Sequence, residues 1–228
     1  IDESLKETQV IIVSPTRELA DQIFTVVKEL SNYTNITLCK VVGGTRVQDC
    51  IQELRKAPHM IIGTPGRIID MLQKKHIFTN KIKTFIIDEA DEMLSQGFQE
   101  LIKCIFNFIP KNTQVGLFSA TYPKELLELS NQFMNKPQKI LVNKEALTLE
   151  GISQYYINVR HHNWKYDVLT DIYNTINIAQ CIIYINHKNR LNQIYEQLLR
   201  DNFPVGMIHG NLMTNERDMI MNKFRQGD

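Results

Sequence analysis

The sequence predicts an α/β fold with mainly parallel sheets flanked by helices. Short apolar runs rich in valine and isoleucine alternate with segments whose apolar residues recur about every 3.6 positions. Such runs are typical of parallel strands buried on both faces, and their alternation with helices is typical of α/β proteins. Six of the runs precede a polar stretch near residue 150 and three follow it, which indicates two lobes.

Nine segments have the composition and length expected of strands. In chain order they are Val10–Val13, Leu38–Val42, Met60–Ile62, Phe85–Ile87, Val115–Phe118, Ile140–Val142, Tyr155–Val159, Cys181–Ile185 and Val205–Ile208. Two stretches between them show helical apolar stripes. The stripes are Leu19, Ile23, Val26, Val27 and Leu30, and Leu191, Ile194, Leu198 and Leu199.

The predicted boundary between the lobes is the stretch NKEALTLEGI at residues 143–152. It is polar, contains Gly151 and loses the periodicity of the flanking sequence. We therefore expect one lobe over residues 1–143, a linker over residues 144–152 and a second lobe over residues 153–228.

Composition indicates a globular protein. Of 228 residues, 43% are apolar and 22% are charged, and the net charge of +1 is too small for a disordered chain. No apolar run approaches the roughly 18 residues that span a membrane. Acidic and basic residues from Asp2 to Glu7 interrupt any signal-like apolar segment.

Cysteine spacing gives no sign of a zinc or redox site. The four cysteines are Cys39, Cys50, Cys104 and Cys181, and no two form a CxxC pair. We expect reduced thiols, which favours the cytosol or the nucleus over secretion.

Polar segments follow the predicted strands at the positions where open α/β sheets bind ligands, beyond the carboxyl ends of the strands. In the first lobe they are SPTRELA (Ser14–Ala20), GGT (Gly43–Thr45), GTPGR (Gly63–Arg67), DEAD (Asp88–Asp91) and SAT (Ser119–Thr121).

An apolar strand that ends in two acids, Asp88 and Glu89, is typical of nucleotide hydrolases. The first acid can hold Mg²⁺ through water, and the second can orient or deprotonate an attacking water. The alternative is that both acids only favour the start of the next helix, whose positive end attracts carboxylates.

Three further turns are suited to phosphate. Thr64 is a good helix N-cap, Gly66 allows close approach of a ligand, and Arg67 adds a fork of donors. Thr16–Glu18 repeats this arrangement, and Gly43–Gly44 offers backbone N–H groups. Ordinary capping and turn chemistry explains such a segment taken singly. Their number at one predicted edge favours an anion-binding surface.

The ordered set PTRELA, GG, TPGR, DEAD and SAT resembles motifs Ia, GG, Ib, II and III of the DEAD-box RNA helicases. In the second lobe, IIYINH at Ile182–His187 resembles motif IV, and TNER at Thr214–Arg217 lies where the family has QxxR. The strings DEADEMLSQGF and ILVNKEALTLEGISQYY resemble the translation initiation factor 4A subgroup. The resemblance covers essentially the whole chain.

The resemblance implies two RecA-like lobes, both incomplete in this chain, that close on ATP and Mg²⁺ and locally unwind RNA. It implies that Asp88 serves Mg²⁺ through water, that Glu89 serves the attacking water, and that Asp91, Ser119 and Thr121 couple hydrolysis to closure. The residues it places along single-stranded RNA, independently of base sequence, are Pro15, Thr16, Arg17, Gly44, Thr64, Gly66, Arg67, Asn186 and Arg217. It also allows a scaffold protein of translation initiation or RNA processing as a partner.

The chain departs from the family pattern in three places. His187 stands where motif IV usually has Thr, and Thr214 stands where QxxR has Gln. The sequence also contains no GxxxxGK[ST] loop, so we expect it to be a piece of a longer protein. A module that holds RNA without turnover remains an alternative to an enzyme, and a DNA helicase is a weaker third possibility.

Residues 1–228 alone are expected to hydrolyse no ATP. Without a Gly-rich loop and its lysine, the β- and γ-phosphates lack their main source of charge stabilisation. The measurement is phosphate release by the purified 228-residue chain with and without RNA. Release stimulated by RNA, in a preparation free of contaminating ATPase, would contradict this expectation.

Overall fold

The computed structural model describes residues 1–95, 97–141 and 151–227. The chain forms two compact units, Ile1–Leu141 and residues 142–228, and each is described here by itself. Most of the expected linker, residues 144–150, lies outside the described residues, so the linker remains a prediction.

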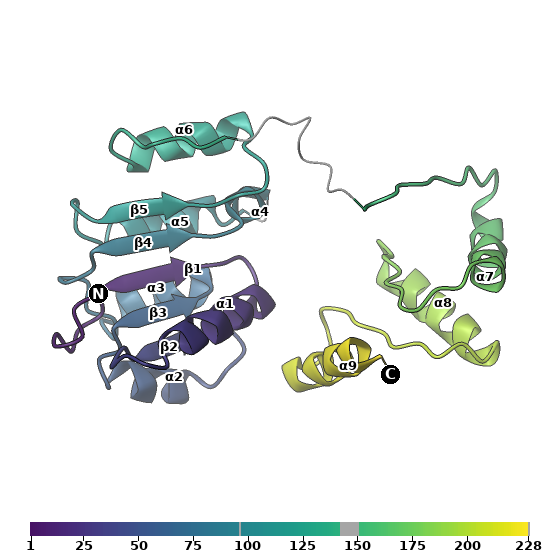
Figure 1. The fold of residues 1–228 in the computed structure, drawn as a ribbon, viewed down its shortest axis with the longest axis horizontal. Helices are drawn as coiled ribbons and strands as arrows, with labels where there is room; N and C mark the ends of the chain where they lie inside the picture. The colour runs from purple at the N-terminus through teal and green to yellow at the C-terminus, as the bar shows by residue number, and fades with distance from the viewer. Residues whose placement is uncertain (96, 142–150, 228) are drawn as a thin grey trace. The chain divides into compact units, whose positions relative to one another are not determined.

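The first unit is built on a sheet of five parallel strands in the order β2-β3-β1-β4-β5 (Figure 1). The strands are β1 Val10–Val13, β2 Leu38–Val41, β3 Met60–Gly63, β4 Thr84–Ile87 and β5 Gln114–Leu117. The five strand predictions up to residue 118 are confirmed to within one residue at either end. The parallel sheet flanked by helices is therefore confirmed in this unit.

Six helices accompany these strands. They are α1 Arg17–Leu30, α2 Val47–Leu54, α3 Pro65–Gln73, α4 Ala90–Ser95, α5 Gln99–Phe106 and α6 Lys124–Phe133. In Figure 1, α1 lies in front of the sheet, and α3 and α5 lie behind it. Each helix except α5, which follows α4, comes after a strand, and parallel strands need such crossover connections.

Alternation along β1 divides the core into two clusters. Ile11 and Val13 point into the cluster covered by α2, α3 and α5, whereas Val10 and Ile12 point into the cluster covered by α1. Successive side chains of a strand point to opposite faces, so an all-apolar strand is what a sheet covered on both sides needs.

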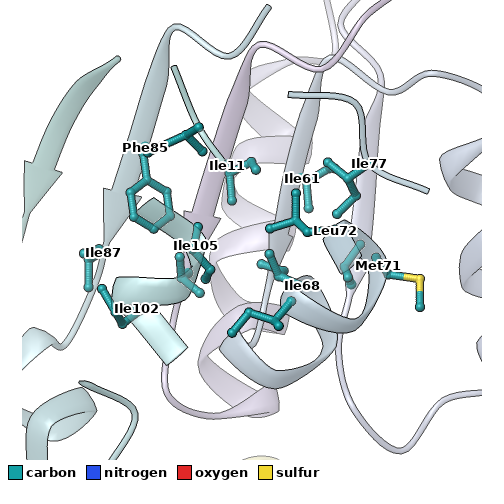
Figure 2. Close-up of a cluster of buried hydrophobic side chains, with 14 of the residues drawn as sticks. Ile11, Ile61, Ile68, Met71, Leu72, Ile77, Phe85, Ile87, Ile102 and Ile105 are labelled. Carbon is teal, nitrogen blue, oxygen red and sulfur yellow. The ribbon is translucent and has the colours of Figure 1, made fainter. Parts of the chain in front are cut away.

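The larger cluster contains most of the fully buried apolar side chains of the unit (Figure 2). Ile11, Ile61 and Phe85 are fully buried in its centre. Phe85 meets Phe106 of α5 edge-on at a centroid distance of 5.2 Å, and Phe106 stacks on Phe133 of α6 at 4.3 Å. These aromatic pairs connect α6 to the sheet through α5.

The stripe expected on α1 is correct in part. Ile23 and Val27 pack against the smaller cluster beside Ala20, but Val26 is 51% exposed and Leu30 is 76% exposed. The helix contacts the sheet along one narrow face, so side chains on the flank of the predicted stripe remain in solvent.

The second unit consists of helices and extended chain in its described part. It contains the short 3₁₀ helix His162–Trp164, followed by α7 Lys165–Thr175, α8 Lys188–Arg200 and α9 Thr214–Gln226. The apolar stripe from Leu191 to Leu199 predicted a helix, and α8 confirms it.

The later strand predictions are wrong for the described residues. The segments Tyr155–Val159, Cys181–Ile185 and Val205–Ile208 are not strands, nor are residues 140–141, and Val142 lies outside the described part. A strand exists only where its backbone pairs with a neighbour, and no such pairing forms within the described residues of this unit. Side chains whose burial the pattern predicted therefore stay exposed, including Tyr155 at 90% and Tyr184 at 88%.

All four cysteines are free thiols, as expected. Burial raises the pKa of Cys39 to about 12, which keeps that thiol protonated and unreactive. None of the helices in the described part of the chain has the length and apolar character needed to cross a membrane.

Gly63, the last residue of β3, fits closely beside β2. A Cβ atom at this position would lie 1.9 Å from the carbonyl oxygen of Val41. That carbonyl accepts a hydrogen bond from the Thr64 N–H at 3.1 Å. Only glycine allows the two strands to end side by side here.

Gly63→Ala is expected to destabilise the first unit by about 1–3 kcal/mol, since the added methyl group must displace backbone. Hydrogen exchange at the Thr64 amide should accelerate. The matched control is Gly66→Ala, whose methyl group would meet no atom within 4 Å and which should leave stability unchanged or raise it. Equal effects of the two substitutions would contradict the assignment.

Candidate functional site

The candidate site is the edge of the sheet where the strands end. The parallel register aligns the last residues of β2, β3, β1, β4 and β5, so the polar segments that follow them begin at one level. Backbone hydrogen bonds continue each ladder one step beyond the strand. They run from Ser14 N–H to Gly63 O, from Thr64 N–H to Val41 O, from Asp88 N–H to Val13 O and from Phe118 N–H to Ile87 O.

Asp88 and Glu89 lie in the sharp turn between β4 and α4. The Asp88 carboxylate accepts a hydrogen bond from the Glu89 N–H at 3.0 Å. Glu89 has a φ of +50°, which is left-handed backbone and costs roughly 1–3 kcal/mol for a residue other than glycine. Strain of this kind persists where the surroundings fix the turn, and such positions concentrate at functional sites.

These contacts test the alternative that Asp88 and Glu89 only stabilise the start of α4. The Asp88 carboxylate accepts its bond from the Glu89 N–H, which precedes α4. Within the described residues, the Glu89 carboxylate accepts no hydrogen bond from the first turn of α4. Helix capping therefore does not explain why a glutamate stands at position 89.

Burial raises the pKa of the Glu89 carboxyl, and the negative charges of Asp88, Asp91 and Glu92 raise it further. A carboxylate whose pKa is shifted upward is a stronger base, which is the direction expected for a proton acceptor near neutral pH.

Asp91 connects the acidic segment to the SAT segment. Its backbone N–H donates to Ser119 Oγ at 3.1 Å, and Thr121 Oγ1 donates to its carboxylate at 2.5 Å. The Ala90 N–H also donates to Phe118 O at 3.0 Å. Burial acts to raise the pKa of Asp91, but the hydrogen bonds from Thr121 and Ser119 outweigh it and hold that pKa below its ordinary value. The two segments therefore form one hydrogen-bonded unit.

The Gly43–Gly44 turn after β2 is packed against Arg17 at the start of α1. Gly44 has a φ of +78°, and a Cβ atom there would lie 2.0 Å from Arg17 Nη1. Both the left-handed backbone and the close guanidinium therefore require glycine.

Thr16 and Thr64 occupy equivalent N-cap positions but use their hydroxyl groups differently. Thr16 Oγ1 accepts a bond from the Leu19 N–H and caps α1. Thr64 Oγ1 makes no capping bond to α3 and accepts instead from the Gly43 N–H at 3.3 Å. The hydroxyl of Thr64 thus joins two of the segments, a role that its capping preference did not predict.

Arg67 in the first turn of α3 reaches across to the same turn. Its Nη2 donates to Thr45 O at 3.1 Å, and its Nη1 lies 3.4 Å from Thr45 Oγ1. Asp70, an acid that could have paired with Arg67, forms its ion pair with Lys74 at 2.6 Å. The guanidinium is therefore hydrogen-bonded to the neutral acceptors of Thr45. Gly66 beside it borders open space.

Pro15, Asn186 and Arg217 are the remaining predicted site residues. Pro15 is buried beneath the turn after β1. In the second unit, Asn186 is exposed before α8, and Arg217 is partly buried in α9. No group of three or more potential metal ligands occurs among the described residues. Thr45 belongs to the site because it accepts hydrogen bonds from Arg67, although the motifs gave it no role of its own.

A family model described as DEAD/DEAH box helicase matches residues 1–129, more than half of the chain. The chain belongs to the DEAD/DEAH box helicase family. A second model, described as Helicase conserved C-terminal domain, matches residues 164–228. The resemblance drawn from the motifs is thereby confirmed.

Relatives within the family support the initiation factor 4A subgroup. The ATP-dependent RNA helicase eIF4A of Meyerozyma guilliermondii is 46% identical over 227 residues, covering 100% of this chain and 57% of that protein. Eukaryotic initiation factor 4A of Cryptosporidium parvum is also 46% identical, over 100% of this chain and 56% of that protein. The chain thus spans little more than half the length of these relatives.

Solved helicase structures share the fold. S. cerevisiae Dbp5 bound to RNA and ADP BeF3 matches with a TM-score of 0.88 and 31% identity, over 100% of this chain and 57% of that one. A DEAD box protein from Methanococcus jannaschii matches with a TM-score of 0.61 and 30% identity, over 99% of this chain and 60% of that one. These matches confirm the RecA-like class of the fold.

Thr121→Val is expected to raise the pKa of the Asp91 carboxyl, because it removes a hydrogen bond to the ionised form. A depressed carboxyl pKa stabilises the folded state above the unfolded value of about 3.9, and that contribution is lost as pH falls through the folded value. The stability difference between variant and parent should therefore shrink in acid.

An NMR titration of Asp91 measures this shift. Thr25→Val on α1 is the control, because Thr25 Oγ1 donates to the Asp21 backbone carbonyl and touches no carboxylate. An unchanged Asp91 pKa in the Thr121 variant would show that the hydrogen bond does not set it.

Proposed function

We propose that the protein is an ATP-dependent RNA helicase, an RNA-dependent ATPase that binds RNA and unwinds it locally. The observation that carries the proposal is the shared sheet edge, where an acidic turn linked to SAT lies beside a cluster of arginine-bearing turns. The printed names of the eIF4A relatives and the RNA and ADP BeF3 bound to Dbp5 support the same function.

The acidic turn suits Mg²⁺ bound with ATP. Mg²⁺ keeps several waters and takes one or two carboxylates together with substrate phosphates, so it needs no cluster of protein ligands. Asp88 at the end of β4 is the carboxylate assigned to it, and the bound ion would supply charge neutralisation at the phosphates. The absence of a larger ligand cluster among the described residues is consistent with such a site.

Glu89 is assigned the role of proton acceptor for the attacking water. Its carboxylate is not engaged by the helix that follows, and its pKa is raised by burial and by neighbouring acids. The fixed left-handed backbone holds the side chain at the head of the turn.

Asp91, Ser119 and Thr121 are assigned the coupling of hydrolysis to movement. The hydroxyl groups of Ser119 and Thr121 both bond to Asp91, two residues from the acceptor Glu89. A shift of the SAT segment would therefore directly change the hydrogen bonds of Asp91 in the acidic turn. The proposed movement is the closure of the two lobes.

Single-stranded RNA is the ligand proposed for the arginine-bearing turns. Arg17 and Arg67 present guanidinium groups beside the backbone of Gly44 and Thr45. Thr64 is the N-cap of α3, and Gly66 lies in its first turn. Guanidinium and backbone N–H donors bind phosphate oxygens and carry no base code, so binding should be independent of sequence.

Further contacts are assigned by family membership. Thr16 and Pro15 in the first unit and Asn186 and Arg217 in the second are proposed to extend the RNA path. A scaffold protein of translation initiation or RNA processing is a proposed partner, supported by the likeness to eIF4A.

Glu89→Gln in the full-length protein is expected to lower ATP turnover by roughly 10²-fold or more, because the amide keeps the size of the side chain but cannot accept the proton. ATP binding should survive. Asp88→Asn should instead weaken binding of Mg²⁺-ATP. The measurements are steady-state phosphate release and nucleotide affinity with and without Mg²⁺.

The outcome also separates an enzyme from a module that only holds RNA. Parental turnover in the Glu89 variant would show that another group is the base. A full-length parent with tight RNA binding and no ATP turnover would favour the holding module.

A further inference from the structure

Arg46 is the last residue of the turn that joins β2 to α2. It follows Gly43, Gly44 and Thr45 directly, and its side chain is exposed. It occupies the N-cap position of α2, with extended backbone at φ −61° and ψ 130°. None of the motifs in the sequence includes it.

Arginine is poorly suited to this position as far as folding is concerned. An N-cap side chain stabilises a helix by accepting a hydrogen bond from a first-turn N–H, and arginine has five donors and no acceptor. Arg46 makes no side-chain capping bond. Its positive charge also stands at the positive end of the helix dipole. Local helix energetics therefore disfavour Arg46 relative to serine or asparagine.

Nothing else in the described part of the chain uses this side chain. The ion pairs found there involve other residues, including Lys56 with Glu53 at the far end of the same helix. Asp49 lies three residues further on in the first turn of α2, but the two side chains form no ion pair. Other helices, including α3, α5 and α8, also begin without a side-chain capping bond, so the exposure and the neighbours of Arg46 are what set it apart.

The neighbours of Arg46 are the groups already assigned to RNA. The carbonyl of Thr45, the preceding residue, accepts from Arg67, and the Gly44 backbone lies against the Arg17 guanidinium. The turn of Gly43–Arg46 is therefore held from two sides by arginines and carries a third at its exposed end. Fixing the turn in this way limits the directions in which the Arg46 side chain can extend.

We propose that Arg46 is a further RNA-binding residue that contacts a backbone phosphate next to those held by Arg17 and Arg67. This inference rests on the proposed function, in which the carboxyl edge of the first sheet binds single-stranded RNA. Arg46 contributes to affinity at the expense of the stability of α2. Because the contact is to phosphate, it strengthens binding to every sequence alike.

The test is a comparison of Arg46→Ala with Arg55→Ala in the full-length protein. Arg55 is an exposed arginine at the C-cap of the same helix, about 13 Å further along the axis, which exceeds the screening length of roughly 10 Å at 0.1 M salt. Both variants lose one positive charge, so the net charge is matched. Affinity for two unrelated single-stranded RNAs is measured at several salt concentrations.

Arg46→Ala is expected to weaken binding to both RNAs equally and to reduce the salt slope of log K by about 0.7, the value for one phosphate contact on a single strand. Arg55→Ala should leave the slope unchanged, and Arg46→Lys should restore most of it. The midpoint of thermal unfolding should be unchanged in Arg46→Ala and raised in Arg46→Ser, because serine can cap α2. A merely structural residue would lose stability and affinity together.

Arg67→Ala, measured in parallel, distinguishes failure of this inference from failure of the proposed function. If Arg67→Ala weakens RNA binding and Arg46→Ala does not, the role of Arg46 is overturned and the RNA surface stands. If neither variant weakens binding, both assignments are overturned. Equal losses in Arg46→Ala and Arg55→Ala would show a general charge effect and would also overturn the role of Arg46.

Discussion

The parallel register of the five strands is the constraint on which the site depends. Each ladder aligns strand ends at the same level, and hydrogen bonds from the next N–H groups extend the ladders into the turns. Two-sided burial keeps that register fixed, because a slip of one residue would turn every inward side chain to the opposite face. The positions of Asp88 and Arg67 are therefore set by the packing of Ile11, Ile61 and Phe85 in the core.

Several turns at this edge have unfavourable local conformations that the core must offset. Glu89 has left-handed backbone, and Arg46 occupies an N-cap position where its side chain forms no capping bond. Each departure costs on the order of 1 kcal/mol, which is a noticeable fraction of the total stability of a domain.

The sequence was sufficient for the strands of the first unit because their side chains are buried on both faces, and continuous apolar runs report that burial directly. The same signal was misleading at Tyr155–Val159, where apolar side chains occur without a paired neighbour. The pattern of apolar runs also did not predict the contacts within the site. That Thr64 bonds to Gly43 rather than to its own helix, and that Arg67 reaches Thr45, depends on the spatial adjacency of β2 and β3, which residue order does not specify.

Strand order also separates two chemistries that would otherwise interfere. Along the edge, the turns after β2, β3 and β1 carry the arginines, and the turns after β4 and β5 carry the acids and hydroxyl groups. Adjacent parallel strands lie about 4.8 Å apart and β4 is the third strand from β2, so the acidic turn stands roughly 14 Å along the edge from Gly44 and Thr45. The chain turns to opposite sides of β1 to reach β3 and β4, and such a switch in strand order is where open α/β sheets place their ligands. The segment after β1, which contains Arg17, therefore borders both halves, and the Asp88 N–H donates to Val13 O across that border.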